Sequence, residues 1–183
     1  MHPEADIIGT DISPTQASWV PPNVRFEMED ATQPWTFEDN TFDFVHSRWL
    51  VGCLTDWNEY VAQAYRVTKP GGWIELVETS IDHTTDDGSV TPDMALHGWG
   101  DLFAEAGRKM GRPTDVVKQG LLVRALQAAG YTDVTSQKLK MPSTGWPADP
   151  HLRQIGQFAH AAMEQDLEGE LRPARYQSSA LTA

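Results

Sequence analysis

Two aspartates follow short apolar stretches that have the pattern of β-strands. Asp11 comes directly after residues 5–10, and Asp30 follows residues 24–28. The carboxyl ends of neighbouring parallel strands meet at one edge of a sheet, where nucleotide-like ligands bind. A carboxylate has two acceptor oxygens, which suits the two hydroxyls of a ribose at Asp11 and an adenine amine at Asp30, with the Ala31 N–H serving a ring nitrogen. Each aspartate is equally well explained as a turn or cap residue, so the pair is more informative than either alone.

A third expected strand, residues 42–46, would place His46, Ser47 and Arg48 at the same edge of the sheet, the rim of the expected ligand site. His46 could line a cofactor site or act as a general base, although a structural hydrogen bond is the commoner role of such a histidine. Arg48 could bind a carboxylate of a substrate or pair with nearby acids. The six histidines lack the spacing of metal ligands, so no metal site is predicted.

The order of the remaining patterns indicates the fold class. Apolar residues alternate along the expected strands and recur at helical spacing along the expected helices. Lys69-Pro70-Gly71-Gly72 is expected to end a helix and lead into a strand. Alternating strands and helices predict an α/β fold with a doubly wound, mostly parallel sheet. The expected strands are 5–10, 24–28, 42–46, 73–78 and 131–140, and the expected helices are 56–67, 92–110, 115–129 and 151–167.

Composition and charge narrow the function classes. The 183 residues carry a net charge of −12, and residues 1–60 hold eleven acidic residues against two arginines. Such a surface repels phosphate backbones, so direct nucleic-acid binding is not expected. The acidic surface would suit a cofactor that carries a positively charged sulfonium, or it serves solubility alone. Cys53 is expected to be a buried structural thiol. The absence of a signal peptide and of an 18-residue apolar run predicts a soluble intracellular protein without membrane contact.

In their order, these motifs resemble filamentous-fungal class I S-adenosylmethionine (SAM)-dependent methyltransferases, which include relatives of a regulator of secondary metabolism. The similarity covers roughly residues 5–168 and is carried by the segments 9–16, 20–24, 29–30, 35–37, 42–48, 69–75, 128–131, 141–142 and 146–149. It implies a Rossmann-like sheet of order 3-2-1-4-5-7-6, SAM as cofactor, and a small-molecule or protein methyl acceptor. By the same resemblance, Asp11 binds the ribose, Ile12 packs on the adenine, Asp30 and Ala31 bind the adenine, and His46, Ser47 and Arg48 border cofactor and substrate.

The sequence departs from the family at its start. The family carries a Gly-rich cofactor loop after its first strand, ahead of the position that Asp11 matches, and only ten residues precede Asp11 here. We therefore expect a partial, N-terminally truncated domain over residues 1–168, without the first strand and that loop, followed by a divergent, poorly ordered tail over 169–183. Activity of this chain is then an open question.

Two other functions stay open beside methyl transfer. One is an inactive methyltransferase-like fragment that acts as a binding module, with a protein partner supplying the missing strand. The other is an NAD-dependent Rossmann enzyme, which the missing loop disfavours equally and which no hydride-transfer residues support. The expected location is the cytoplasm or the nucleus.

Overall fold

The computed structural model describes residues 3–14, 16 and 19–179, with side chains described as far as residue 165. Thr15, within the first motif above, and the last four residues of the expected tail lie outside this description. The chain divides into two compact units. The first unit comprises Met1–Thr79 and Val116–Thr132, and the second comprises Ser80–Asp115 and Asp133–Ala183.

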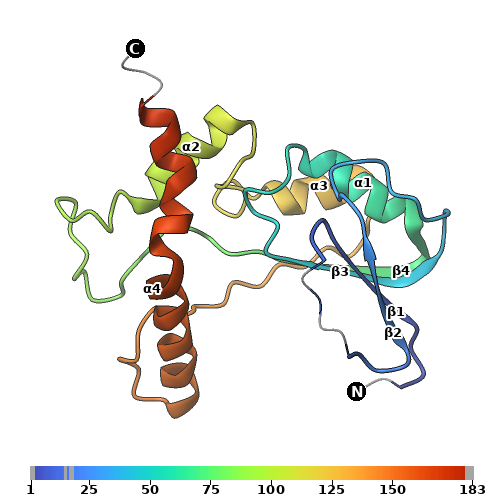
Figure 1. Ribbon diagram of the computed structural model, residues 1–183, viewed down its shortest axis with the longest axis horizontal. Helices are drawn as coiled ribbons and strands as arrows, with labels where there is room; N and C mark the ends of the chain where they lie inside the picture. The colour runs from blue at the N-terminus through green and yellow to red at the C-terminus, as the bar shows by residue number, and fades with distance from the viewer. Residues whose placement is uncertain (1–2, 15, 17–18, 180–183) are drawn as a thin grey trace. The chain divides into compact units, whose positions relative to one another are not determined.

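The strands of the first unit form two parallel pairs (Figure 1). Strand β1 (Ile7–Asp11) pairs with β2 (Val24–Met28) without a register shift. Strand β3 (Phe42–Arg48) pairs with β4 (Thr68–Val77). Across the described residues, each sheet has two strands and no ladder joins the two pairs. The expected α/β class with parallel strands is confirmed.

Strand β4 begins earlier than the sequence predicts. Its first residue, Thr68, pairs with Phe42, whereas Trp73 pairs with Phe44, so the ladder is irregular between them. The extra residues form a bulge, in which Gly71 has a positive φ of 80° that a side chain would disfavour. The Pro-Gly segment is therefore accommodated within the strand, and the expected start at residue 73 is wrong.

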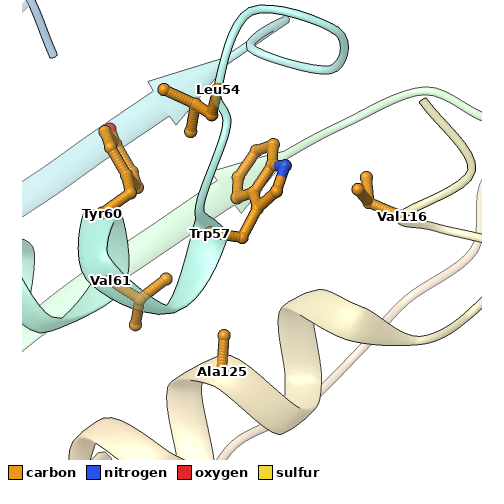
Figure 2. Packing of buried hydrophobic residues seen from close by; sticks show 6 residues of the cluster. All are labelled: Leu54, Trp57, Tyr60, Val61, Val116 and Ala125. Atoms are coloured by element: carbon orange, nitrogen blue, oxygen red, sulfur yellow. The ribbon is translucent and has the colours of Figure 1, made fainter. Parts of the chain in front are cut away.

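Helix α1 (Trp57–Val67) begins at a capped end and buries one face. The Asp56 side chain accepts hydrogen bonds from the backbone N–H groups of Asn58 and Glu59, at 2.8 and 3.1 Å. These bonds satisfy donors that the first helical turn leaves without partners. The buried face lies in a core cluster, shown in Figure 2 and formed by Leu54, Trp57, Tyr60, Val61, Val116 and Ala125.

Helix α3 (Leu121–Ala129) packs against α1 and completes the first unit. It is shorter than the expected helix over 115–129, because Gly120 adopts a left-handed conformation at its start. Gly130 ends it in the same conformation, as the sequence predicts.

The second unit contains helices α2 (Trp99–Met110) and α4 (Pro150–Ser179), which contact each other. Helix α2 starts later than expected, because residues 91–98 form turns in which Met94 N–H donates to Thr91 O and His97 N–H to Met94 O. The strand expected over residues 131–140 is wrong, since no ladder forms in that segment of the described chain. Within the part of the chain that the structure describes, no helix has the length and apolar character needed to cross a membrane.

Replacing the α1 cap should destabilise the first unit. We expect Asp56→Ala to lower the free energy of unfolding by about 1 kcal/mol, because two backbone donors lose their acceptor. Asp56→Asn keeps a side-chain oxygen at the cap and should cost clearly less. Urea unfolding followed by tryptophan fluorescence measures both, and equal costs for the two variants would contradict a capping role.

Candidate functional site

Asp11 and Asp30 both lie at the carboxyl end of the β1–β2 sheet. Asp11 is the last residue of β1 and pairs with Met28, and its backbone carbonyl accepts the N–H of Glu29 at 3.1 Å. Because β2 ends at Met28, Asp30 follows within two residues of the same edge. The strands therefore bring the two predicted ligand-binding carboxylates to one edge, as the parallel arrangement requires.

Both carboxylates also take part in turns. Asp11 Oδ1 accepts the backbone N–H of Ser13 at 2.8 Å. Asp30 Oδ1 accepts the backbone N–H and the hydroxyl of Thr32, at 2.9 and 2.7 Å. The turn interpretation of each aspartate thus has direct support. It does not compete with ligand binding, since a carboxylate has about four acceptor positions and these bonds hold its orientation.

The neighbours of these aspartates differ in exposure. Ile12 leaves 66% of its surface exposed, so its apolar side chain is available to a flat ring. Ala31 is half-buried and packs against the core cluster together with Trp35.

The segment after β2 is also held against α1, because the Arg66 guanidinium donates to the backbone carbonyls of Trp35 and Phe37, at 3.0 and 2.7 Å.

His46 lies within β3 and pairs across the sheet with Glu75 of β4. Its Nδ1 is 2.9 Å from Glu75 Oε2, and both side chains are about half exposed. A carboxylate at Nδ1 favours the tautomer with the proton on that nitrogen. The other ring nitrogen, Nε2, then carries the lone pair, which is the state that a general base needs.

Ser47 and Arg48 end up on different sides of the sheet. Arg48 is exposed at the end of β3, where the sequence predicts it. The Ser47 side chain is buried near Tyr60 of α1, so its expected position on an open substrate rim is corrected to a core position. Burial raises the pKa of the Tyr60 phenol, and the nearby Ser47 hydroxyl only partly offsets that rise. Alternation along a strand accounts for the difference, because His46 and Arg48 face one side and Ser47 the other.

The core cluster links the two carboxyl edges of the first unit. Ala31 from the segment after β2 packs against it, as do Leu50 and Val51 from the segment after β3. The predicted adenine-binding segment and the predicted rim therefore rest on the same buried side chains.

Two acidic residues of the site were not predicted from the sequence. Glu75 contacts His46, and Glu78 accepts backbone N–H groups of Leu50 and Val51. The pairing of an acidic residue with a histidine on a neighbouring parallel strand can be predicted only once the register of the two strands is known. Cys53, in contrast, is exposed rather than a buried structural thiol.

Comparison with known proteins gives a consistent result. Residues 1–76 match the family model described as a methyltransferase domain. Methyltransferase pytC of Aspergillus terreus is 33% identical over 168 residues, which cover 91% of this chain and 51% of pytC. The secondary metabolism regulator LAE1 of Cochliobolus heterostrophus is 32% identical over 166 residues, covering 90% of this chain and 53% of LAE1. This chain thus spans about half the length of these curated relatives.

Among solved structures, phosphoethanolamine N-methyltransferase 2 of Haemonchus contortus, in complex with S-adenosyl-L-methionine, aligns with a TM-score of 0.48. It is 20% identical, and the alignment covers 86% of this chain and 32% of that protein.

The tautomer of His46 can be measured. We expect its neutral imidazole to carry the proton on Nδ1, and Glu75→Ala to shift it toward the Nε2–H form that free histidine prefers. Nitrogen-15 chemical shifts of the ring distinguish the two forms. His160, which faces Glu164 through Nε2, is an internal control that Glu75→Ala should leave unchanged. An Nε2–H form of His46 in the unaltered chain would exclude the arrangement described above.

Proposed function

This chain belongs to the SAM-dependent methyltransferase family, with homologues in fungal secondary metabolism, and on that premise we propose that it binds SAM and transfers the methyl group to a small-molecule or protein acceptor. The observation that carries the proposal is the shared carboxyl edge of β1 and β2, where Asp11 and Asp30 lie beside the exposed Ile12. These are the chemical groups that an adenosine requires.

The donor and acceptor set of this edge fits the adenosine part of SAM. Asp11 uses Oδ1 for the Ser13 turn, and its carboxylate can still accept ribose hydroxyls. The turn at Thr32 fixes the orientation of the Asp30 side chain, which would accept the adenine amine. Ile12 would cover one face of the adenine ring. The surplus of acidic residues among residues 1–60 favours a cofactor that carries a positive charge.

Bound SAM would supply an activated methyl group on a sulfonium leaving group. The protein then contributes mainly by holding the acceptor close to that methyl group and in line with it. Arg48, exposed at the end of β3, would bind an anionic part of the acceptor. If the acceptor atom is a hydroxyl oxygen, His46 Nε2 would take its proton while Glu75 holds the proton on Nδ1.

Partners and location belong to the same proposal. The acceptor is a small molecule or a protein, and nucleic acid and membrane are not expected partners. A strand from a partner could pair with the open edge of β1 or β3, because each is hydrogen-bonded on one side only among the described residues. The proposed location is the cytoplasm or the nucleus.

Replacing Asp11 tests the cofactor site. We expect micromolar binding of SAM to the full chain, and Asp11→Ala should weaken it by roughly tenfold or more, because hydrogen bonds to a charged acceptor are lost. Calorimetric titration measures the affinity. Asp6→Ala is the matched control, since Asp6 precedes β1 at the opposite end of the sheet and pairs with Arg25.

The outcomes separate the functions considered above. A folded chain that binds no SAM would exclude the proposed activity for this chain and favour an interaction module. Binding of NADH in place of SAM would favour an oxidoreductase. Equal losses in Asp6→Ala and Asp11→Ala would show that overall charge, rather than the strand edge, determines binding.

A further inference from the structure

A single carboxylate holds the turn that follows β3. The chain leaves the sheet at Trp49, whose φ of 63° is in the left-handed region that a tryptophan rarely adopts. The next two backbone N–H groups, of Leu50 and Val51, donate to Glu78 Oε1 and Oε2 at 2.9 and 3.0 Å. Each oxygen of the carboxylate therefore takes one donor from the turn. Consecutive backbone N–H groups that converge in this way form an anion-binding concavity, and here a side chain of the same unit fills it.

The register of the sheet puts Glu78 in position for this role. Arg48 pairs with Val77 as the last step of the β3–β4 ladder, and Trp49 N–H still donates to the Val77 carbonyl at 3.2 Å. Glu78 is the next residue of the chain after β4. Its side chain thus replaces the backbone acceptors that the ladder would have provided if β3 had continued.

Burial of the charged Glu78 carboxylate lowers the stability of the folded state. Glu78 is half-buried, and burial raises its pKa, while the bonds from Leu50 and Val51 lower it only in part. The other titratable group that faces it is the Tyr60 phenol of α1, which is neutral at physiological pH. Glu78 forms no ion pair among the described residues. A glutamate in such surroundings is better explained by the turn that it holds than by a gain in stability.

That turn determines where the predicted rim points. On its inner side, Leu50 and Val51 pack against the core cluster, which Ala31 also contacts. On its outer side, Arg48 and Trp49 are exposed, and Trp49 leaves 56% of its surface uncovered. A change in the turn would therefore move Arg48 and Trp49 relative to the adenosine edge of the site.

We propose that Glu78 is a positioning residue of the methyltransferase site, which fixes the turn over residues 49–53 and so places Arg48 and Trp49 at the rim. This inference rests on the function proposed above. Glu78 contacts neither cofactor nor acceptor in this role and acts through the backbone of the turn. Nothing in the local sequence predicts it, because Glu78 and Leu50 come together only through the register of β3 and β4.

The test uses the full chain with Glu78→Ala, Glu78→Gln and the control Glu59→Gln, an exposed acid on α1 of the same unit. Amide hydrogen exchange measured by NMR reports on Leu50 and Val51, and calorimetric titration reports on SAM. Glu78→Ala should lower the protection of both amides and weaken SAM binding, each by roughly tenfold, because both acceptors are lost. Glu78→Gln keeps one acceptor oxygen and should expose only one of the two amides. The control should match the unaltered chain in both measurements.

The results distinguish this inference from the proposed function. Unchanged protection of Leu50 and Val51 in Glu78→Ala would overturn the role of Glu78 in the turn. Lost protection with unchanged SAM affinity would show that the turn positions nothing that the cofactor needs, which also overturns the proposal. If the unaltered chain binds no SAM, the proposed function fails first, and the positioning role fails with it, whatever the exchange data show.

Acid titration gives a second, independent signature. A protonated carboxyl group can no longer accept from both amides, so protection factors at Leu50 and Val51 should fall as pH decreases through the pKa of Glu78. Because burial raises that pKa, the fall should occur at a higher pH than for an ordinary glutamate. The folded state binds this proton more tightly than the unfolded state, so the contribution of Glu78 to global stability should improve over the same interval.

Opposite trends in local protection and global stability are therefore expected, and Glu78→Gln should remove both. Parallel loss of protection across the whole first unit, or a pH response that persists in Glu78→Gln, would assign the effect to other groups.

Discussion

The rest of the first unit depends on the burial of one face of α1. Trp57, Tyr60 and Val61 come from this helix, and the core cluster gains Leu54, Val116 and Ala125 from three other parts of the chain. The hydrophobic effect has no direction, so any apolar segment could cover this face. What selects the segments is their connection to the strands: the chain after β2 contributes Ala31 and Trp35, and the chain after β3 contributes Leu50 and Val51. Segments that follow two different sheets thereby pack against one core cluster, although the described residues form no hydrogen-bond ladder between those sheets. The geometry of the candidate site is a consequence of core packing.

Polar contacts then specify orientations that packing leaves open. Arg66 fixes the segment after β2 through two carbonyls, the turn at Thr32 fixes Asp30, and Glu78 fixes the turn after β3. Each of these bonds pairs a side chain with backbone groups that a loop would otherwise leave to water. They explain how residues that belong to loops can still be held in defined positions. They also make a turn role compatible with the ligand-binding role proposed for Asp11 and Asp30, since an oriented carboxylate loses less freedom when it binds.

The sequence predicted an element correctly wherever its local pattern alone determined the structure. Residues 24–28, the helix over residues 56–67 with its apolar face, and the helix end before Gly130 were predictable because periodicity and capping chemistry act within a few residues. Prediction failed where a partner was needed. Residues 131–140 have an alternating pattern but no neighbouring strand in the described chain, and an isolated strand has no acceptors for its backbone. The bulge at Gly71 shifted the start of β4, and the inward position of Ser47 followed from the end of β3 lying two residues beyond the expected one. The roles of Glu75 and Glu78 depend on register, which no single segment contains.

Family membership and catalytic activity make different demands on these residues. Contacts to the adenosine part of a cofactor are the same before and during methyl transfer, so the contacts proposed for Asp11, Asp30 and Ile12 would raise affinity without accelerating the reaction. Acceleration requires groups whose effect depends on the placement of the acceptor, and the ones proposed in this unit are Arg48 and His46 with their positioning residues Glu75 and Glu78. An error of about 1 Å in such placement can reduce a rate roughly a hundredfold. The two sets lie on different sheets, and the core cluster with its attached loops connects them. Affinity for SAM and turnover are therefore distinct properties of this chain, and the turn after β3 bears on both, because Leu50 and Val51 pack against the same core cluster as Ala31.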